Sequence, residues 1–219
     1  MALNKFDELT CIVLEYREPG WTEKTLKSLG KARVPSENII FADRDGVGSI
    51  SKAFNRAIEK VTTKYAWFLT NVTFAPGMPE SLIDALNNSQ AIAVHPAFDS
   101  DHGHIRSAKG VEYAPFIEWT APAFDMACFH EIGLCDEQLP YWGMDLDWSH
   151  RANQVYESAL VVDGRFRLNH TYLRHSAPHP ISVIRRNLRA LYDGDTKDRL
   201  TKKYGKQWQK TIWPETAPA

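Results

Sequence analysis

The first 98 residues alternate between short apolar runs and segments with helical spacing of apolar residues. Four runs are predicted to form buried strands: TCIVLEY (10–16), NIIFAD (38–43), YAWFLT (65–70) and AIAVHPAF (91–98). The segments between them repeat apolar residues every three to four positions, as amphipathic helices do. This β-α-β-α-β-α-β order predicts an α/β fold with a mostly parallel central sheet and helices on both faces.

The second half of the chain is less regular and predicts a mixed sheet. Residues 116–129 are expected to form a strand or edge segment that ends in a short helix. Residues 158–163 and 167–173 are expected to form two further strands. Two amphipathic helices, about 182–192 and 195–209, complete the pattern.

No repeat, low-complexity tract or Pro/Gly-rich linker divides the chain, so we expect a single domain. Its body would span residues 1–180, in two halves over about 1–98 and about 99–180. The basic C-terminal helices, 181–219, would pack on the same domain.

Charge is distributed unevenly along the 219 residues. Residues 1–180 hold 17 basic and 23 acidic side chains, and residues 181–219 hold 9 basic and 4 acidic, so a net charge of −1 conceals a basic end. That end is explained either by a solvated amphipathic helix or by contact with a phosphorylated donor or polyanionic acceptor.

The chain has no run of 18 apolar residues, and its first residues contain no signal-peptide hydrophobic segment. We therefore expect a cytoplasmic protein without integral membrane contact. Cys11, Cys128 and Cys135 are unevenly spaced, which predicts reduced structural thiols rather than a disulfide framework or zinc site.

Gly46, Gly48 and Ser49 follow a predicted strand and precede a predicted helix. Their backbone amides could hold a phosphate at the helix N-terminus. The match to GxGxxG is incomplete because Ser51 stands at the third glycine position, and no acidic residue ends the next strand. Both departures disfavour a nicotinamide cofactor.

Asp43 ends the second predicted strand, and Asp45 follows two residues later. Ligands of open α/β sheets bind beyond the carboxyl ends of the strands, where an aspartate can accept hydrogen bonds from a nucleobase or ribose. The alternative is that Asp43 simply terminates its strand.

The segment YWGMDLDW places Asp145 and Asp147 after a glycine and among three aromatic residues. We interpret Asp145 as a general base, with helix capping as the alternative. Asp147 is better explained by a pair with Arg151, four residues on.

The order of these motifs resembles that of family-two glycosyltransferases, which have the A-type nucleotide-diphospho-sugar transferase fold, a single-domain Rossmann-like fold. The resemblance covers about residues 10–175. It is carried by CIVLEYREPGWTEKTLKSL, NIIFAD, GVGSISKAFNRAI, YAWFLTNVTFAPG and the block EWTAPAFDMACFHEIGLCDEQLPYWGMDLDWSHRA, which is similar to the family pattern fDe…gEDvDl…R.

The resemblance implies transfer of a hexosyl or related group from a nucleotide-sugar donor, with a UDP-sugar favoured, to an acceptor hydroxyl. The nucleotide would bind in the half over about 1–98 and the acceptor in the half over about 99–180. Asp145 would deprotonate the acceptor hydroxyl in an inverting reaction. Asp136-Glu137 and Asp147 match the other acidic positions of the pattern, which would place Asp147 on the acceptor side. The donor would contact Asp43, Asp45, Gly46, Gly48, Ser49 and Asn71. The acceptor would be a saccharide or, as the second option, a hydroxymethylated base in DNA.

The chain departs from the family where the metal-binding DxD is expected, because Thr70-Asn71-Val72 contains no carboxylate. Thr and Asn are poor ligands for Mn²⁺ or Mg²⁺. A divalent cation is therefore absent or held elsewhere, and the candidate ligands are His170, His175, Asp101 and His102. Without a metal, the diphosphate could be stabilised by Arg174, Arg185 and Arg186.

Trp119 and Trp142 lie beside polar residues in the acceptor-side block. Sugars and unpaired bases stack on aromatic faces, so one of the two indoles is a candidate acceptor platform, with the hydrophobic core as the alternative. The missing DxD also leaves open a non-catalytic nucleotide-sugar or saccharide binding module on the same fold.

Overall fold

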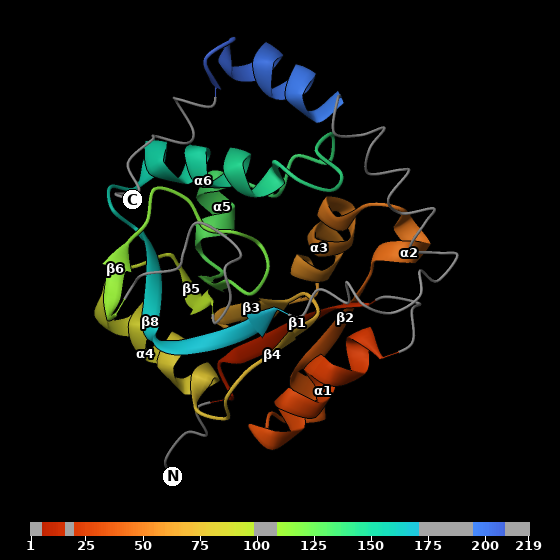
Figure 1. The fold of residues 1–219 in the computed structure, drawn as a ribbon, viewed down its shortest axis with the longest axis vertical. Coiled ribbons are helices and arrows are strands. Elements are labelled where there is room, and N and C mark those ends of the chain that lie inside the picture. The colour runs from red at the N-terminus through yellow and green to blue at the C-terminus, as the bar shows by residue number, and fades with distance from the viewer. Residues whose placement is uncertain (1–5, 16–19, 99–108, 171–194, 209–219) are drawn as a thin grey trace.

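The computed structural model describes residues 6–15, 20–98, 109–170 and 195–208. These residues form a central sheet with helices packed on both faces (Figure 1). The predicted α/β class, with a mostly parallel sheet covered on both sides, is confirmed.

The elements follow the predicted alternation through the first half of the chain. In chain order they are β1 (Leu9–Glu15), α1 (Trp21–Lys31), η1 (Ser36–Asn38), β2 (Ile39–Asp43), α2 (Arg44–Val47), α3 (Ile50–Ile58), β3 (Tyr65–Leu69), β4 (Val72–Thr73), α4 (Met78–Asn88), β5 (Ala93–Phe98), β6 (Val111–Tyr113), β7 (Ala123–Asp125), α5 (Cys128–Ile132), α6 (Met144–Val155) and β8 (Leu160–His170). A helix over residues 195–204 follows.

The strand order is β2-β1-β3-β7-β5-β8-β4, with β6 paired to β8. β1 lies parallel to both β2 and β3, and β5 lies parallel to β8. β7 is antiparallel to its two neighbours, β3 and β5. Of the two alternatives for residues 116–129, a strand or an edge segment, the strand is confirmed as β7, which lies between β3 and β5. Ala123 and Phe124 are apolar and buried, as expected for a strand in the interior of a sheet.

Successive residues of β1 supply two separate hydrophobic cores, as the alternation of side chains along a strand requires. Cys11 and Val13 face a core formed with α1 and α4, on one side of the sheet. Ile12 and Leu14 face a core formed with α3, α5 and α6, on the other side (Figure 1). Leu200, from the helix over residues 195–204, also belongs to the second core.

The two strands predicted over residues 158–163 and 167–173 form one strand in the described structure, β8, which ends at His170. Its pairing with β5 shifts between Asp163, which lies opposite Pro96, and Arg167, which lies opposite Ala97. The predicted break therefore corresponds to an irregularity in the pairing rather than to a loop. Residues 171–173 lie outside the described residues.

Asp163 is buried at this irregularity. Its carboxylate accepts hydrogen bonds from Ser81 Oγ at 2.7 Å and from Arg165 Nε and Nη2 at 2.8 Å each. Burial alone would raise the pKa of Asp163, but the hydrogen bonds from Arg165 and Ser81 outweigh it and leave the pKa below its ordinary value. The ionised carboxylate therefore stabilises the fold by joining α4 to β8.

The C-terminal helix is attached to α6 through a second buried carboxylate. Asp147 is 0% exposed, and its oxygens lie 3.0 Å from Arg151 Nε, 2.5 Å from Lys203 Nζ and 2.6 Å from the Tyr204 hydroxyl. Arg151 also donates to the carbonyl oxygens of Ile132, the last residue of α5, and of Leu134, which follows α5. One carboxylate thus organises three segments that are distant in the sequence. The predicted helix over 182–192 lies outside the described residues.

We expect Asp163→Asn to lower the free energy of unfolding by about 1.5–3 kcal/mol at pH 7, as for lost hydrogen bonds to a charged group. Because the folded-state pKa is lowered, the contribution is complete above the ordinary aspartate value of 3.8 and is lost as the pH falls through the folded-state pKa. Urea unfolding at pH 7 and pH 3 measures both effects. Exposed Glu157→Gln serves as the control, and equal stability of the two variants at pH 7 would contradict the assignment.

We expect Tyr204→Phe to lower the free energy of unfolding by about 1.5–3 kcal/mol, because it removes a hydrogen bond to an ionised and buried carboxylate. Asp147→Ala should lower it by about 3–5 kcal/mol, since Arg151 and Lys203 lose their common partner. The matched control is Tyr113→Phe, at a tyrosine that is 54% exposed. If Tyr204→Phe unfolds at the same urea concentration as Tyr113→Phe, the attachment of the C-terminal helix does not depend on this bond.

Candidate active site

Several segments meet at the carboxyl-terminal edge of the parallel strands. In the register of the sheet, Glu15 at the end of β1 lies opposite Asp43 at the end of β2. The segment before β7 reaches the same edge because β7 runs in the opposite direction, and Thr70 donates its backbone N–H to Thr120 O at 2.9 Å. Open α/β sheets bind ligands at this edge.

Asp145 lies in the first turn of α6, but it is not the N-cap. The N-cap is Gly143, whose φ of 79° is in the left-handed region that favours glycine. A Cβ atom there would also approach Thr196 Cγ2 to 3.0 Å, so the C-terminal helix restricts this position. Asp145 is therefore not the N-cap that the capping alternative requires, although its carboxylate accepts hydrogen bonds from backbone amides of the same turn, including that of Leu146.

The Asp145 side chain is only partly exposed. Burial raises the pKa of Asp145, and hydrogen bonds from backbone amides, including those of Leu146 at 2.9 Å and of Trp119, only partly oppose this effect. A carboxylate with a raised pKa is a stronger base than an ordinary aspartate. This environment suits a general base.

Backbone contacts place Asp145 beside the end of β3. The Asp145 carboxylate accepts a hydrogen bond from the backbone of Trp119, and the next residue, Thr120, accepts from both the backbone N–H and the hydroxyl of Thr70, at 2.9 and 3.1 Å. Two consecutive residues, Trp119 and Thr120, thus connect the candidate base to Thr70, in the segment that stands where the DxD motif is expected.

The segment Thr70-Asn71-Val72 forms the tight connection between β3 and β4. Asn71 is buried and has a φ of 46°, a left-handed conformation that asparagine tolerates better than most residues. The Val72 backbone is held by the buried Thr25 hydroxyl, which donates to Val72 O at 3.0 Å and accepts from Val72 N–H at 3.1 Å. His170 lies opposite Val72 in the register of β4 and β8.

The candidate metal ligands are only partly placed by the structure. The β4–β8 pairing brings the His170 position next to the connection between β3 and β4, while His175, Asp101 and His102 lie outside the described residues. No group of three or more His, Cys, Asp or Glu side chains that could hold a metal ion occurs within the described part of the chain. The arginines predicted to contact the diphosphate, Arg174, Arg185 and Arg186, also lie outside it.

The prediction of a phosphate-binding glycine loop is wrong. Gly46 lies inside the short helix α2, and a Cβ atom there would come within 2.0 Å of Asp43 Oδ2, so the glycine accommodates Asp43 rather than a ligand. Gly48 has a φ of 68° as the C-cap of α2. Ser49 is buried and caps α3 by accepting from Lys52 N–H at 3.3 Å.

The loop before α6 occupies the N-terminus of α3. Ile50 donates its N–H to Pro140 O at 2.8 Å, and the Tyr141 hydroxyl donates to Gly48 O at 2.7 Å. The bond to Pro140 occupies the Ile50 N–H, a donor that an anion at this helix N-terminus would have used. The two contacts also link the Asp145 loop to the end of β2.

Asp43 ends β2, as the structural alternative predicted, and is also the N-cap of α2. Its Oδ1 accepts from Gly46 N–H at 2.7 Å, while its side chain is exposed at the edge of the sheet. Asp45 is partly buried in the helix that Asp43 caps. Nucleotide contact by Asp43 and Asp45 stays a prediction.

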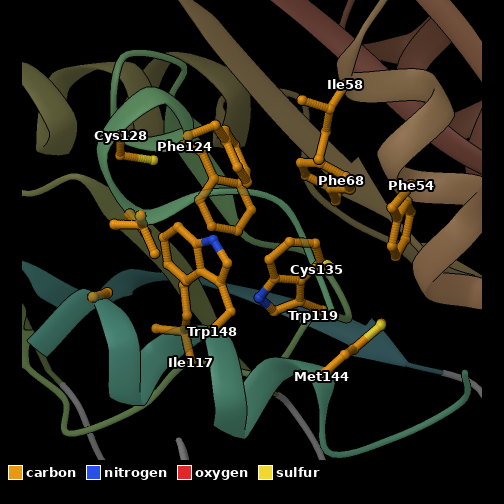
Figure 2. Close-up of a cluster of buried hydrophobic side chains, with 14 of the residues drawn as sticks. Phe54, Ile58, Phe68, Ile117, Trp119, Phe124, Cys128, Cys135, Met144 and Trp148 are labelled. Atoms are coloured by element: carbon orange, nitrogen blue, oxygen red, sulfur yellow. The ribbon is translucent and has the colours of Figure 1, made fainter. Parts of the chain in front are cut away.

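The expectation that Trp119 is an acceptor platform is wrong, because its ring is buried in an aromatic cluster. Trp119 is 4% exposed, and its ring centroid lies 5.0 Å from that of Phe124, 5.2 Å from Phe68 and 5.8 Å from Trp148. Figure 2 shows these side chains converging between α3 and α6. The polar neighbours of Trp119 in the sequence concealed its core position.

Trp142 is partly buried and packs against the same core, and its contact with an acceptor stays a prediction. The acceptor-side assignment of Asp147 is wrong, since its carboxylate is fully buried and bonded to three side chains. Its pairing with Arg151, the structural alternative, is confirmed.

The sequence analysis did not identify Arg44, a buried arginine beside Asp43. Its guanidinium lies 5.4 Å from the centroid of the Tyr141 ring, so it contributes a positive charge between β2 and the Asp145 loop. A lone arginine after a strand carries no periodic signal. Its contact with Tyr141 depends on the tertiary structure, which brings residues 141–145 to α2.

Comparison with solved structures identifies the fold. The chain is similar to GalNAc-T7 crystallised with UDP, GalNAc and Mn²⁺, with a TM-score of 0.59 and 14% identity over 75% of this chain and 44% of that one. It is similar to S. aureus TarS 1–349, with a TM-score of 0.56 and 13% identity over 75% of this chain and 60% of that one. For TarS 1–349 in complex with UDP-GlcNAc, the TM-score is 0.56 and the identity 11%, over 94% and 70%.

No protein-family model and no curated protein sequence matches the chain. The chain spans about half the length of the GalNAc-T7 and TarS structures it resembles, at 44% and 60%. None of the helices formed by the described residues is long and apolar enough to cross a membrane. At 11–14% identity the comparisons establish architecture, and they show that this chain has the A-type nucleotide-diphospho-sugar transferase fold.

Proposed function

We propose that this protein transfers a sugar from a UDP-sugar to an acceptor hydroxyl, with inversion at the anomeric carbon and Asp145 as the general base. The observation that carries the proposal is the position of Asp145, a carboxylate of raised pKa held beside the end of β3 by the backbone of Trp119. The solved structures with UDP and UDP-GlcNAc support the choice of donor.

In the proposed reaction the acceptor hydroxyl donates a hydrogen bond to Asp145. As the hydroxyl oxygen attacks the anomeric carbon, its proton passes to the Asp145 carboxylate and the bond to the diphosphate oxygen breaks. The electron pair of that bond leaves with UDP. One base suffices for a single in-line displacement, so the reaction requires no second carboxylate.

The donor would lie along the edge from β2 to β3. The exposed Asp43 carboxylate has Oδ1 engaged by Gly46 and can accept from the uracil or ribose through Oδ2. Asn71 would orient the donor at the end of β3. Asp45 would act on the donor indirectly, because it lies in the first turn of α2, the helix that Asp43 caps.

A divalent cation is implied by the fold, but the described residues do not fit one. Thr70, Asn71 and Val72 offer no carboxylate, and hard cations such as Mg²⁺ and Mn²⁺ prefer carboxylate oxygens. We therefore derive no step through a metal. The lack of a carboxylate in residues 70–72 also favours the second candidate function, a non-catalytic nucleotide-sugar or saccharide binding module.

We expect Asp145→Asn to reduce UDP release from a UDP-sugar, with water as the acceptor, by at least 100-fold, because general-base catalysis contributes about 10²–10⁴-fold. Binding of the donor should persist. The midpoint of thermal unfolding should not fall, since the substitution removes a buried charge. Asp195→Asn, at an exposed aspartate, is the control, and a rate for Asp145→Asn within threefold of that control would exclude the base assignment.

The rate should rise with pH through the raised pKa of Asp145, because only the ionised form accepts the proton. The acid limb of log kcat/KM should therefore lie above 3.8, the ordinary aspartate value. The effect of pH on stability has the opposite sign. Because the pKa of Asp145 is raised in the folded state, its neutral form contributes to the free energy of unfolding at low pH. This contribution is lost as the pH rises through the folded-state pKa. A pH–rate profile that stays flat down to pH 3.8 would contradict the proposal.

A further inference from the structure

Residues 119–121 connect Asp145 to the end of β3, and they lie shortly before β7 in the chain. The Trp119 backbone donates to the Asp145 carboxylate. Thr120 O accepts from both the backbone N–H and the hydroxyl of Thr70. The position of the Asp145 carboxylate relative to β3 therefore depends on what holds residues 119–121.

On the side of β3, residues 119–121 and the proline that follows them are held by donors of the strand itself. Phe68 donates its N–H to Pro122 O at 2.9 Å. The Trp67 indole donates through Nε1 to Ala121 O, also at 2.9 Å. Together with the bonds from Thr70, these contacts extend the association of the two strands past the end of their regular pairing.

On the side of β5, the backbone pairing stops earlier. The pair nearest to residues 119–121 joins Val94 to Ala123. Extending that register would place Pro96 opposite Ala121. Proline interrupts a strand ladder, since it has no N–H. A side chain takes the place of the ladder here, because the Ala121 N–H donates to His95 Nε2 at 3.3 Å.

His95 is 0% exposed, and backbone groups engage both of its ring nitrogens. Nδ1 lies 2.5 Å from Pro96 O, a carbonyl oxygen that can only accept, so Nδ1 carries the proton. Nε2 is then the unprotonated nitrogen that the Ala121 N–H requires. The ring also packs against Phe98, with 5.0 Å between the ring centroids. The imidazole thus joins a carbonyl of β5 to an N–H of residues 119–121 in one tautomer.

We propose that His95 is a positioning residue for the general base: its imidazole fixes residues 119–121 and, through Trp119, the orientation of the Asp145 carboxylate. His95 acts without touching the substrate, because it is fully buried and its Nε2 is bonded to Ala121. The catalytic part of the inference rests on the proposed glycosyl transfer. The part that concerns the contact between residues 119–121 and Asp145 does not.

The first measurement uses nitrogen-15 NMR of the unmodified chain, so it does not depend on the folding of a variant. We expect His95 at pH 7 to be protonated on Nδ1 and unprotonated on Nε2. A ring that carries its proton on Nε2 at this pH would overturn the proposal, because it could not accept from Ala121.

Substitutions of His95 separate its hydrogen bond from its volume. His95→Gln keeps an acceptor, since the amide oxygen of glutamine reaches the position of Nε2, whereas His95→Leu removes the acceptor. His95→Asn is a second variant without the contact, because its shorter amide reaches only the position of Nδ1. The control is Val162→Ala. Val162 is buried opposite His95 in the register of β5 and β8, and its substitution leaves the acceptor of the Ala121 N–H in place.

The second measurement is the pH response of two amide signals, those of Trp119 and Leu146, which both donate to Asp145. Leu146 is the internal reference, because its bond lies within the first turn of α6. We expect both signals to follow the ionisation of Asp145 in the unmodified chain, in His95→Gln and in Val162→Ala. In His95→Leu and His95→Asn, only the Leu146 signal should still respond. An unchanged Trp119 response in these two variants would overturn the proposal.

The rate of UDP release from a UDP-sugar tests the catalytic part. We expect His95→Leu to lower kcat/KM by about tenfold or more, since a misplacement of about 1 Å can cost about 100-fold. Its acid limb should move to higher pH, because the Asp145 carboxylate loses a hydrogen bond that favours its ionised form. His95→Gln should restore the rate and the acid limb. A merely structural role would lower the midpoint of thermal unfolding in His95→Leu and Val162→Ala alike and leave the acid limb of both unmoved.

The amide signals and the rates together separate this inference from the proposed function. A Trp119 response that depends on His95, in a chain that releases no UDP, would support the contact and contradict the transferase. UDP release that depends on Asp145 but is equal in His95→Leu and His95→Gln would overturn this inference alone.

Discussion

The buried carboxylate of Asp147 is the interaction on which the candidate active site depends. Removing an aspartate from water is costly, and the cost is offset here by Arg151, Lys203 and Tyr204 together. Arg151 extends the network to the carbonyl oxygen of Leu134, beyond α5. The result is that α6, the loop after α5 and the C-terminal helix form one unit.

This unit determines where Asp145 lies, because Asp145 is two residues before Asp147 on the first turn of α6. The turn begins at Gly143, where a Cβ atom would approach Thr196 Cγ2 of the C-terminal helix to 3.0 Å. The loop that precedes it bonds the turn between α2 and α3 through Pro140 and Tyr141. A change in the C-terminal helix can therefore reach the candidate base without touching it.

The fold was largely predictable because strands and helices alternate with strong periodicity up to Phe98. The order of β3, β7 and β5 was not, since β7 contains only Ala123, Phe124 and Asp125 and its antiparallel direction is set by tertiary packing. The irregularity at Asp163 was anticipated as a break between two strands. A local pattern reveals such a defect but not how the chain continues through it.

The candidate site was predicted less well, for identifiable physical reasons. The glycine at position 46 is required by the Asp43 side chain, and a sequence motif cannot distinguish that requirement from close approach by a phosphate. Trp119 has polar neighbours in the sequence but aromatic neighbours in space. The Asp147–Arg151 pair was identified because i, i+4 spacing is a local property of a helix.

The most direct test of the central claim is donor binding by the unmodified chain. Thermal unfolding would be followed with UDP-, GDP-, ADP-, CMP- and dTDP-linked sugars, each with and without Mn²⁺. A donor at 100 times its dissociation constant stabilises the folded state by about 2.7 kcal/mol. The account predicts a raised midpoint with a UDP-linked sugar and smaller shifts with the other nucleotides. An unchanged midpoint with every donor, in the presence and absence of Mn²⁺, would contradict it.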